Sequence, residues 1–413
     1  MSRIAVLGAG ITGVTTAYLL TQAGHDVTVV DRRLYAAMDT SFANGGQLSA
    51  SNAEVWNQPA TLLKGLRWMF QPDAPLLLNP RPSWHKYSWL AEFLWAIRKY
   101  RQNTVLTTQL AIEARRHLFE MAEREGVSFD LEQRGILHFY HDRASFEAAG
   151  KSNALLRQGG LDRVAVTPAE IATLEPTLTG RYVGGYYTRS DATGDIHKFT
   201  RGLAAACERH GARFLYGREV GSLDFAHGKV QVGTHAIDAA SGVAAAVPDM
   251  LDVDAIVVCG GVGSRGLAAM AGERLNVYPV KGYSITVHLD DEASVQGAPW
   301  TSLLDEKAKI VTSRLGRDRF RVAGTAEFNG ENRDIRADRI DPLVRWTRAN
   351  FAMSTARVVP WAGLRPMMPD MMPRVKRGRR AGVYYNTGHG HLGWTLSAAT
   401  AVQVTELIQA DLH

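Results

Sequence analysis

The amino-terminal residues constrain the fold more than any other feature of this 413-residue chain. A short apolar run from Arg3 to Leu7 predicts a buried strand, and the glycine pattern GAGITG follows at 8–13. A helical stretch then continues to about Ala23, and a second apolar run, Val27 to Val30, ends at Asp31. Strand, glycine turn, helix, strand and acid in this order are typical of a unit that binds a dinucleotide.

Each glycine of this unit has a physical role. Gly8 permits the tight turn after the strand, Gly10 lets the backbone approach a pyrophosphate, and Gly13 lets the helix pack closely on the sheet. The helix amino terminus, with the amides of Ile11 and Thr12, then faces the phosphates with a partial positive charge. We expect Asp31 to accept hydrogen bonds from a ribose diol.

The residues after this unit bear on which dinucleotide is bound. Arg32 and Arg33 suggest a ligand for a 2′-phosphate, but Asp31 would repel that phosphate. The unit by itself does not show whether NAD or FAD is bound. A small, polar, glycine-rich segment at 40–47 follows, where a nicotinamide dehydrogenase usually continues with regular βα units. Such a segment suits close backbone approach to a large bound ring, and a flexible loop is the alternative.

Composition excludes several classes of protein. Hydrophobic residues make up 46% of the chain and charged residues 21%, which excludes a disordered or fibrous chain. The excess of 47 Lys and Arg over 41 Asp and Glu is too diffuse for a nucleic-acid binder. Cys207 and Cys259 form neither a disulfide framework nor a metal pattern. Without a signal peptide or an apolar run of about 18 residues, we expect a cytoplasmic protein, at most peripheral at the inner face of the membrane.

Later segments predict the architecture. The apolar run 251–259 leads into a second glycine turn at 260–263, and 384–396 reads as strand, glycine turn and helix. Alternating residues at 278–288 and 307–325 indicate antiparallel strands. We therefore expect an α/β fold, with a discontinuous Rossmann-like cofactor-binding domain and a second α+β substrate domain built on an antiparallel sheet. The expected cofactor domain comprises 1–58, 143–275 and 356–413, and the expected substrate domain comprises 59–142 and 276–355.

Three segments were harder to interpret. Residues 59–82 are rich in Pro and Leu and predict an irregular excursion with short helices. The aromatic segment from Ser83 to Tyr100 is apolar nearly all round, which favours a buried helix over an interfacial helix. Five basic residues within 374–380 favour a solvated loop, and contact with anionic lipid or a partner subunit is the alternative.

Taken together, several unusual segments give the chain a resemblance from end to end to the FAD-dependent D-amino acid dehydrogenases of the small-subunit type. These belong to the D-amino acid oxidase and glycine oxidase superfamily. The segments that carry the resemblance are GAGITG with Asp31, TSFANGGQLS (40–49), RWMFQPDAPL (67–76), ATGD (192–195), YPVKGYSITV (278–287), SLLDEKAKI (302–310), WAGLRPMMPD (361–370) and NTGHGHLGWT (386–395).

The resemblance implies non-covalent FAD and oxidation of an amino acid at its α-carbon by hydride transfer to the flavin, with electrons passed to a quinone or another electron-transfer partner. It implies that Arg365 binds the substrate carboxylate, and a guanidinium suits that role because it binds a carboxylate bidentately. Tyr283 and His389 complete the expected catalytic group, although a structural role for Tyr283 is equally open, and Lys281 is either near the cofactor or structural. The further FAD contacts it implies are Arg32, Ser41, Asn44, Gly45, Gly46, Gln47, Leu48, Val220, Gly260, Gly261, Gly388, Gly390, His391, Leu392, Gly393 and Trp394.

The resemblance also implies that a helix beginning near Gly393 stabilises the reduced flavin with its positive end. No metal is expected, because His389 and His391 have no third ligand nearby. Two other functions stay open: oxidation of cyclic or secondary amines such as cis-4-hydroxy-D-proline, and a flavin-binding redox subunit that needs a partner. Preference for D over L substrates comes from the resemblance alone.

Overall fold

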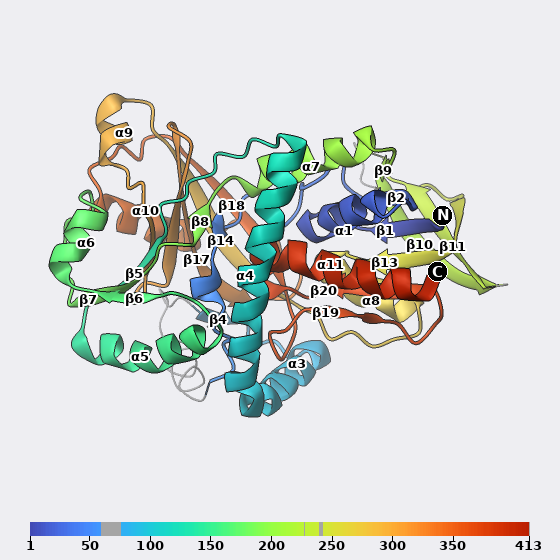
Figure 1. The fold of residues 1–413 in the computed structure, drawn as a ribbon, viewed down its shortest axis with the longest axis horizontal. Coiled ribbons are helices and arrows are strands. Elements are labelled where there is room, and N and C mark those ends of the chain that lie inside the picture. Colours follow the sequence, from blue (N-terminus) through green and yellow to red (C-terminus); the bar gives the residue numbers. More distant parts are fainter. Residues whose placement is uncertain (59–75, 227, 239–242, 413) are drawn as a thin grey trace.

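The computed structural model describes residues 1–58, 76–226, 228–238 and 243–412. Two large sheets form opposite ends of the molecule, and the long helix α4 (Tyr100–Glu125) runs between them (Figure 1). As expected, this helix ends at Gly126, which adopts the left-handed conformation with φ of 63°.

The first sheet is built on the amino-terminal unit. Its strand order is β19 (Arg374–Arg377), β20 (Val383–Thr387), β13 (Ala255–Val258), β1 (Arg3–Leu7), β2 (Asp26–Asp31) and β9 (Arg213–Tyr216). The strands from β20 to β9 are parallel, and only β19 is antiparallel. Every residue of β13 and β20 is buried, as expected of parallel strands covered on both faces. Packed with this sheet are α1 (Ile11–Gln22), α7 (Ile196–Arg209), α8 (Ser264–Met270) and α11 (Gly393–Leu412).

A three-stranded antiparallel sheet adjoins the first sheet. It contains β10 (Arg218–Ala226), β11 (Lys229–Ala236) and β12 (Asp249–Val253). The single strand expected over 251–259 is wrong, because the chain divides it between β12 and β13. The break falls at Asp254, whose carboxylate accepts a hydrogen bond from the Arg3 amide at 2.7 Å.

The second sheet is predominantly antiparallel, as expected. Its order is β18 (Val358–Met367), β14 (Tyr278–His288), β17 (Arg319–Phe328), β16 (Ile310–Leu315), β15 (Ser302–Asp305), β5 (Ile136–Tyr140), β7 (Gly184–Thr188) and β6 (Val164–Val166), and β4 (Leu76–Leu78) pairs with β17. Strands β6, β7 and β18 therefore pair within this sheet, although the ranges 143–275 and 356–413 were expected in the cofactor domain. The pairing partner of a strand, rather than its place in the chain, decides its sheet.

Helices and short strands complete the second half of the molecule. The helix α6 (Pro168–Leu174) begins with the expected capping box of Thr167 and Glu170. The other elements are β3 (Gln47–Leu48), which pairs with β8 (Ala192–Thr193), and the helices α3 (Trp84–Trp95), α5 (Arg143–Gln158), α9 (Glu292–Gly297) and α10 (Ala337–Asn350).

The aromatic helix α3 is not the buried helix that the sequence favoured. Trp89 and Phe93 are buried and stacked on each other, but Trp84 is 83% exposed and Trp95 is 67% exposed. The prediction failed because an apolar sequence all round a helix does not by itself supply packing partners on every side. None of the helices that the structure describes is long and apolar enough to span a membrane.

The basic segment at 374–380 is also not a simple loop. Residues Arg374–Arg377 form the edge strand β19, which pairs with β20, and two of their charges also pair with acids. Lys376 contacts Glu273 at 2.8 Å, and Arg377 contacts Asp411 at 2.6 Å. The irregular excursion expected over 59–82 lies outside the described residues up to 75, and its next three residues form β4.

Candidate active site

A cavity of about 1050 Å³ lies between the two large sheets. Its wall combines the glycine turn after β1, the 37–58 segment, one face of the second sheet and the residues that begin α11. The volume exceeds the upper end of the usual range for small-ligand pockets. Every residue predicted for the site lines this cavity except Gly13 and Leu48.

Both exceptions have a physical reason. A side chain at Gly13 would place its Cβ 1.8 Å from the carbonyl oxygen of Gly8, so this glycine serves the close approach of helix and strand. Leu48 is 1% exposed and packs in the core around α1. It alternates with Gln47 along β3, and only Gln47 reaches the cavity. A direct cofactor contact by the side chain of Leu48 is therefore wrong.

The acid at the end of β2 stabilises the glycine turn. One oxygen of Asp31 accepts a hydrogen bond from the Ala9 amide at 2.6 Å, and the other accepts one from the Arg33 amide at 2.7 Å. Burial raises the pKa of Asp31 above its usual value. The predicted contact between this carboxylate and a ribose stays a prediction.

Side chains of the second sheet fix the glycine-rich segment at three consecutive carbonyl groups. Hydrogen bonds run from Ser284 Oγ to Ala43 O at 2.7 Å, from Arg321 Nη1 to Asn44 O at 2.9 Å, and from Ser313 Oγ to Gly45 O at 2.6 Å. At the other side of the segment, Ser41 Oγ accepts the hydrogen bond of the Ile11 amide at 3.0 Å, in the first turn of α1. The segment is therefore a braced wall of the cavity and not a flexible loop.

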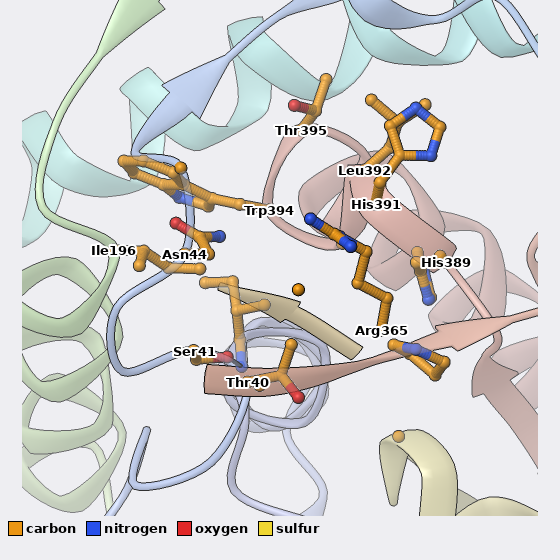
Figure 2. Close-up of a pocket in the computed structure, with 18 of the residues that line it drawn as sticks. Thr40, Ser41, Asn44, Ile196, Arg365, His389, His391, Leu392, Trp394 and Thr395 are labelled. Atoms are coloured by element: carbon orange, nitrogen blue, oxygen red, sulfur yellow. Dashed lines mark hydrogen bonds between the residues drawn. The ribbon is translucent and has the colours of Figure 1, made fainter. Parts of the chain in front are cut away.

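Arg365 extends into the cavity from β18 (Figure 2). Its guanidinium lies over Gly282 of β14, where a Cβ would be only 2.3 Å from Nη2. Nη1 donates to the carbonyl oxygen of Thr325 at 3.0 Å. Among the described residues no carboxylate lies within 4 Å of it. Burial lowers the pKa of Arg365 to about 10, which leaves the group charged at neutral pH.

A β-bulge presents the carbonyl group that holds Arg365. The register between β14 and β17 shifts between Lys281 and Tyr283, which places an extra residue on β17. Thr325 lies in that stretch with φ of 59°, a strained conformation for a β-branched residue. β-Bulges and strained backbone conformations are common beside active sites, where they turn a group in a direction that a regular strand does not allow.

Tyr283 does not point toward Arg365. Side chains alternate along β14, so Gly282 faces Arg365 and Tyr283 faces the opposite side of the sheet. There its hydroxyl donates to Glu327 Oε2 at 2.7 Å, and its ring packs with Ile285 in the apolar core. This geometry favours the structural role for Tyr283, and a contact between its hydroxyl and a substrate stays a prediction. Lys281, on the same face, is fully buried and donates to Asn332 Oδ1 at 2.7 Å.

Two histidines lie in the cavity wall before α11, and both are neutral (Figure 2). Burial lowers the pKa of His389 to about 3, and its Nε2 is 2.9 Å from Thr400 Oγ1. Burial also lowers the pKa of His391 to about 4; its ring stacks on Trp56 at 4.9 Å, and its Nε2 is 3.1 Å from Asn52 O. These contacts orient both rings, and a catalytic role for His389 stays a prediction.

The residues present fit a flavin dinucleotide. The second glycine turn is open on the cavity side, since a Cβ at Gly261 would meet no atom within 4 Å. Gly388 and Gly390 have φ values of 77° and 61°, which the turn into α11 requires of glycine. The buried indole N–H of Trp394 has no hydrogen-bond acceptor among the described residues, so the wall retains an unused donor.

Sequence analysis missed several residues of the cavity. Gly282 is the most informative, because a glycine inside a strand indicates close approach of another group. Ser284 and Ser313 carried no such signal, since their partners lie more than 240 residues away in the chain. Trp56 and Glu54 also line the cavity, and nothing in their local sequence separates them from surface residues.

Comparisons with known proteins show which family the chain belongs to. A "D-amino acid dehydrogenase 3" of Mesorhizobium japonicum is 60% identical over 100% of this chain and 98% of its own length. A "D-amino acid dehydrogenase" of Dechloromonas aromatica is 41% identical over 98% of this chain and 96% of its own. The solved structure of glycine oxidase from Geobacillus kaustophilus is similar with a TM-score of 0.74 at 18% identity, covering 100% and 96% of the two chains.

Among solved structures, L-proline dehydrogenase from P. horikoshii is also similar, with a TM-score of 0.72 at 17% identity, covering 99% and 93% of the two chains. The family model DAO, described as "FAD dependent oxidoreductase", matches residues 3–407. The chain therefore belongs to the DAO family of FAD-dependent oxidoreductases.

Proposed function

We propose that this protein oxidises a D-amino acid at the α-carbon, giving an imine that water hydrolyses to a 2-oxo acid and ammonia. The observation that carries the proposal is Arg365, a charged guanidinium inside the cofactor cavity with no carboxylate within 4 Å among the described residues. A buried cation of this kind is stabilised by an anionic ligand, and a carboxylate matches its fork of donors.

The side chains of this protein orient the substrate, and none of them accepts the hydride that the substrate loses. Arg365 binds the carboxylate from the side of the second sheet, while the braced segment 41–47 and the turn 388–394 are expected to hold the cofactor. When bound, FAD supplies the acceptor for the hydride that leaves the α-carbon. Because His389 and His391 are neutral, Arg365 is the cation of this part of the wall, and orientation of the substrate is the main contribution of the protein.

The stereochemical preference rests on the relatives named D-amino acid dehydrogenase. The fold does not determine it, since glycine oxidase and L-proline dehydrogenase share this architecture. An anaerobic titration of the flavin absorption with D-alanine, L-alanine and cis-4-hydroxy-D-proline separates the candidates. We expect D-alanine to bleach the flavin, and bleaching by the cyclic amine alone would favour the secondary-amine function.

Arg365→Ala tests the site. We expect normal FAD content and a fall of about 100-fold or more in kcat/KM for D-alanine, because the carboxylate loses its anchor. Arg365→Lys is the matched variant, which keeps the charge and loses the bidentate geometry, so an intermediate loss is expected. Unchanged kcat/KM in Arg365→Ala with FAD bound would contradict the role of Arg365.

We propose further that electrons leave for a respiratory acceptor and that α3 touches the membrane surface. Trp84, Tyr87 and Trp95 are exposed on this helix, and the guanidinium of Arg98 stacks at 3.9 Å on the Trp95 ring. Exposed aromatic residues on α3 and a basic residue in the turn that follows it suit a membrane interface. Sedimentation with anionic vesicles tests this contact, and the double variant Trp84→Ala with Trp95→Ala is expected to weaken vesicle binding.

The alternative that the protein is a redox subunit needing a partner for turnover has its own test. Full-rate reduction of a soluble dye by the isolated chain would reject that alternative.

A further inference from the structure

Glu54 lies in the wall of the active-site cavity, in the segment that follows Asn52. Its Oε1 atom accepts three hydrogen bonds from neutral donors: Gln58 Nε2 at 2.5 Å, Tyr100 Oη at 2.5 Å and Ser152 Oγ at 2.6 Å. Three donors converging on one oxygen fix the direction of the carboxylate.

The second oxygen of Glu54 has no partner among the described residues. Oε2 is absent from every hydrogen bond there, and no Lys, Arg or His nitrogen lies within 4 Å of the carboxylate. The atom is also not among the buried polar atoms that lack a partner, and Glu54 lines the cavity. An anchored carboxylate with one free oxygen is suited to accept hydrogen bonds from a cation.

The neighbouring charges do not provide that cation. Glu306, in the same cavity wall, is already paired with Lys309 at 2.5 Å and with His138 at 2.9 Å. Arg163 also lines the cavity, but it is only 3% exposed and packs over the Tyr186 ring at 4.8 Å. Lys309 feels the charge of Glu54, but it forms its ion pair with Glu306. Within the described part of this wall, Glu54 therefore offers an accessible carboxylate with no ion pair within 4 Å.

The position of Glu54 relative to Arg365 fits a long side chain. The Arg365 guanidinium reaches β17 through Thr325, and Glu54 is held by Ser152 of α5, a helix that packs against β5. Three strand spacings separate β17 from β5 in the sheet, about 14 Å. An extended arginine with a hydrogen bond at each end spans a comparable distance, about 13 Å.

We propose that Glu54 is a specificity-determining residue that binds the cationic end of a basic D-amino acid while Arg365 binds its carboxylate. This inference rests on the proposed function. The substrate class it assigns is D-amino acids with a guanidinium or ammonium group at the end of the side chain, D-arginine foremost.

D-Arginine and D-citrulline form the test pair, because they have nearly the same shape and differ in the charge of the terminal group. We expect wild-type kcat/KM to be at least about tenfold higher for D-arginine, the effect of a charge-assisted hydrogen bond. Glu54→Gln is expected to bring the ratio of the two values close to one. Glu147→Gln is the matched control, since Glu147 is exposed on α5, is not among the cavity-lining residues and forms an ion pair with Arg143 at 2.9 Å. This variant is expected to keep the wild-type ratio.

Two outcomes would overturn the inference. The first is equal kcat/KM for D-arginine and D-citrulline in the wild type, which requires no variant. The second is an unchanged ratio of the two kcat/KM values in Glu54→Gln; an equal fall in both values would assign Glu54 to a contact that all substrates share. If one of these outcomes is found while the wild type still oxidises D-alanine, this inference alone has failed. If the wild type oxidises no D-amino acid, the proposed function itself is contradicted.

Discussion

Replacing Gly282 by alanine tests whether the position of Arg365 limits catalysis. An alanine Cβ would be 2.3 Å from Nη2, 2.4 Å from Cζ and 2.5 Å from Nη1 of Arg365. An ordinary contact begins near 3.4 Å, so the guanidinium must move by about 1 Å. The strand itself tolerates alanine, because Gly282 does not lie in the left-handed region.

A displacement of about 1 Å at a group that orients the substrate costs on the order of 100-fold in rate. We therefore expect kcat/KM for D-alanine to fall about 100-fold in Gly282→Ala. FAD content should stay normal, since Gly282 supports Arg365 and not the braced segment 41–47. The assay is steady-state reduction of a soluble dye, with the flavin absorption measured on the same sample.

Gly150→Ala is the matched control. Gly150 lies within α5, and its added Cβ would meet only the Tyr186 hydroxyl at an ordinary 3.4 Å. This variant should keep wild-type kcat/KM and gain slightly in stability from helix propensity. If the Gly282→Ala enzyme binds FAD and keeps wild-type kcat/KM, the prediction is refuted. Catalysis would then tolerate a displacement of the Arg365 guanidinium of about 1 Å.

Other parts of the structure give three further predictions. Ser313→Ala removes the hydrogen bond to Gly45 O, and it should lower the free energy of unfolding by about 1 kcal/mol and weaken FAD retention, measured by dialysis of the holoenzyme. Asp191→Asn leaves the charge of Arg115 without its buried partner at 2.8 Å, so a loss of about 3 kcal/mol is expected in denaturant titrations, and a loss below 1 kcal/mol would contradict it. Because burial lowers the pKa of His389 to about 3 from 6.5, the unfolded state binds an additional proton below pH 6.5, and stability falls as the pH drops from 6.5 toward 3. His389→Asn should reduce the slope of unfolding free energy between pH 6 and pH 5 by up to about 1.4 kcal/mol per pH unit, and an unchanged slope would show that His389 is protonated in the folded protein.

Local sequence patterns predicted the parts of the molecule that local interactions build. The unit from Arg3 to Asp31 formed as expected, because its glycines and apolar runs act within a few residues of one another. Arg365 and the 388–394 turn were predicted through resemblance, and the cavity contains both.

The failures concern contacts between distant parts of the chain. The sequence left two roles open for Tyr283, substrate contact and structural support, because the side that a residue faces depends on the register with β18. The aromatic helix α3 was expected to be buried, and only its packing partners reveal which face is covered. Glu54 had no signal at all, since Tyr100 and Ser152 come from two other segments.

Strand β14 connects the substrate anchor to the wall that is expected to hold the cofactor. Gly282 and Ser284 are alternate residues on one face, so one lies beneath the Arg365 guanidinium and the other holds the Ala43 carbonyl. Two residues along a strand span about 7 Å, and this spacing changes little because both neighbouring strands are hydrogen bonded to β14. A slip of one residue would turn both groups to the opposite face, and it would bring the side chains of Tyr283 and Lys281 to the side of Arg365. An extended, paired strand is therefore a better support for this reaction than a loop, because it fixes the substrate carboxylate and the cofactor segment against a single rigid element.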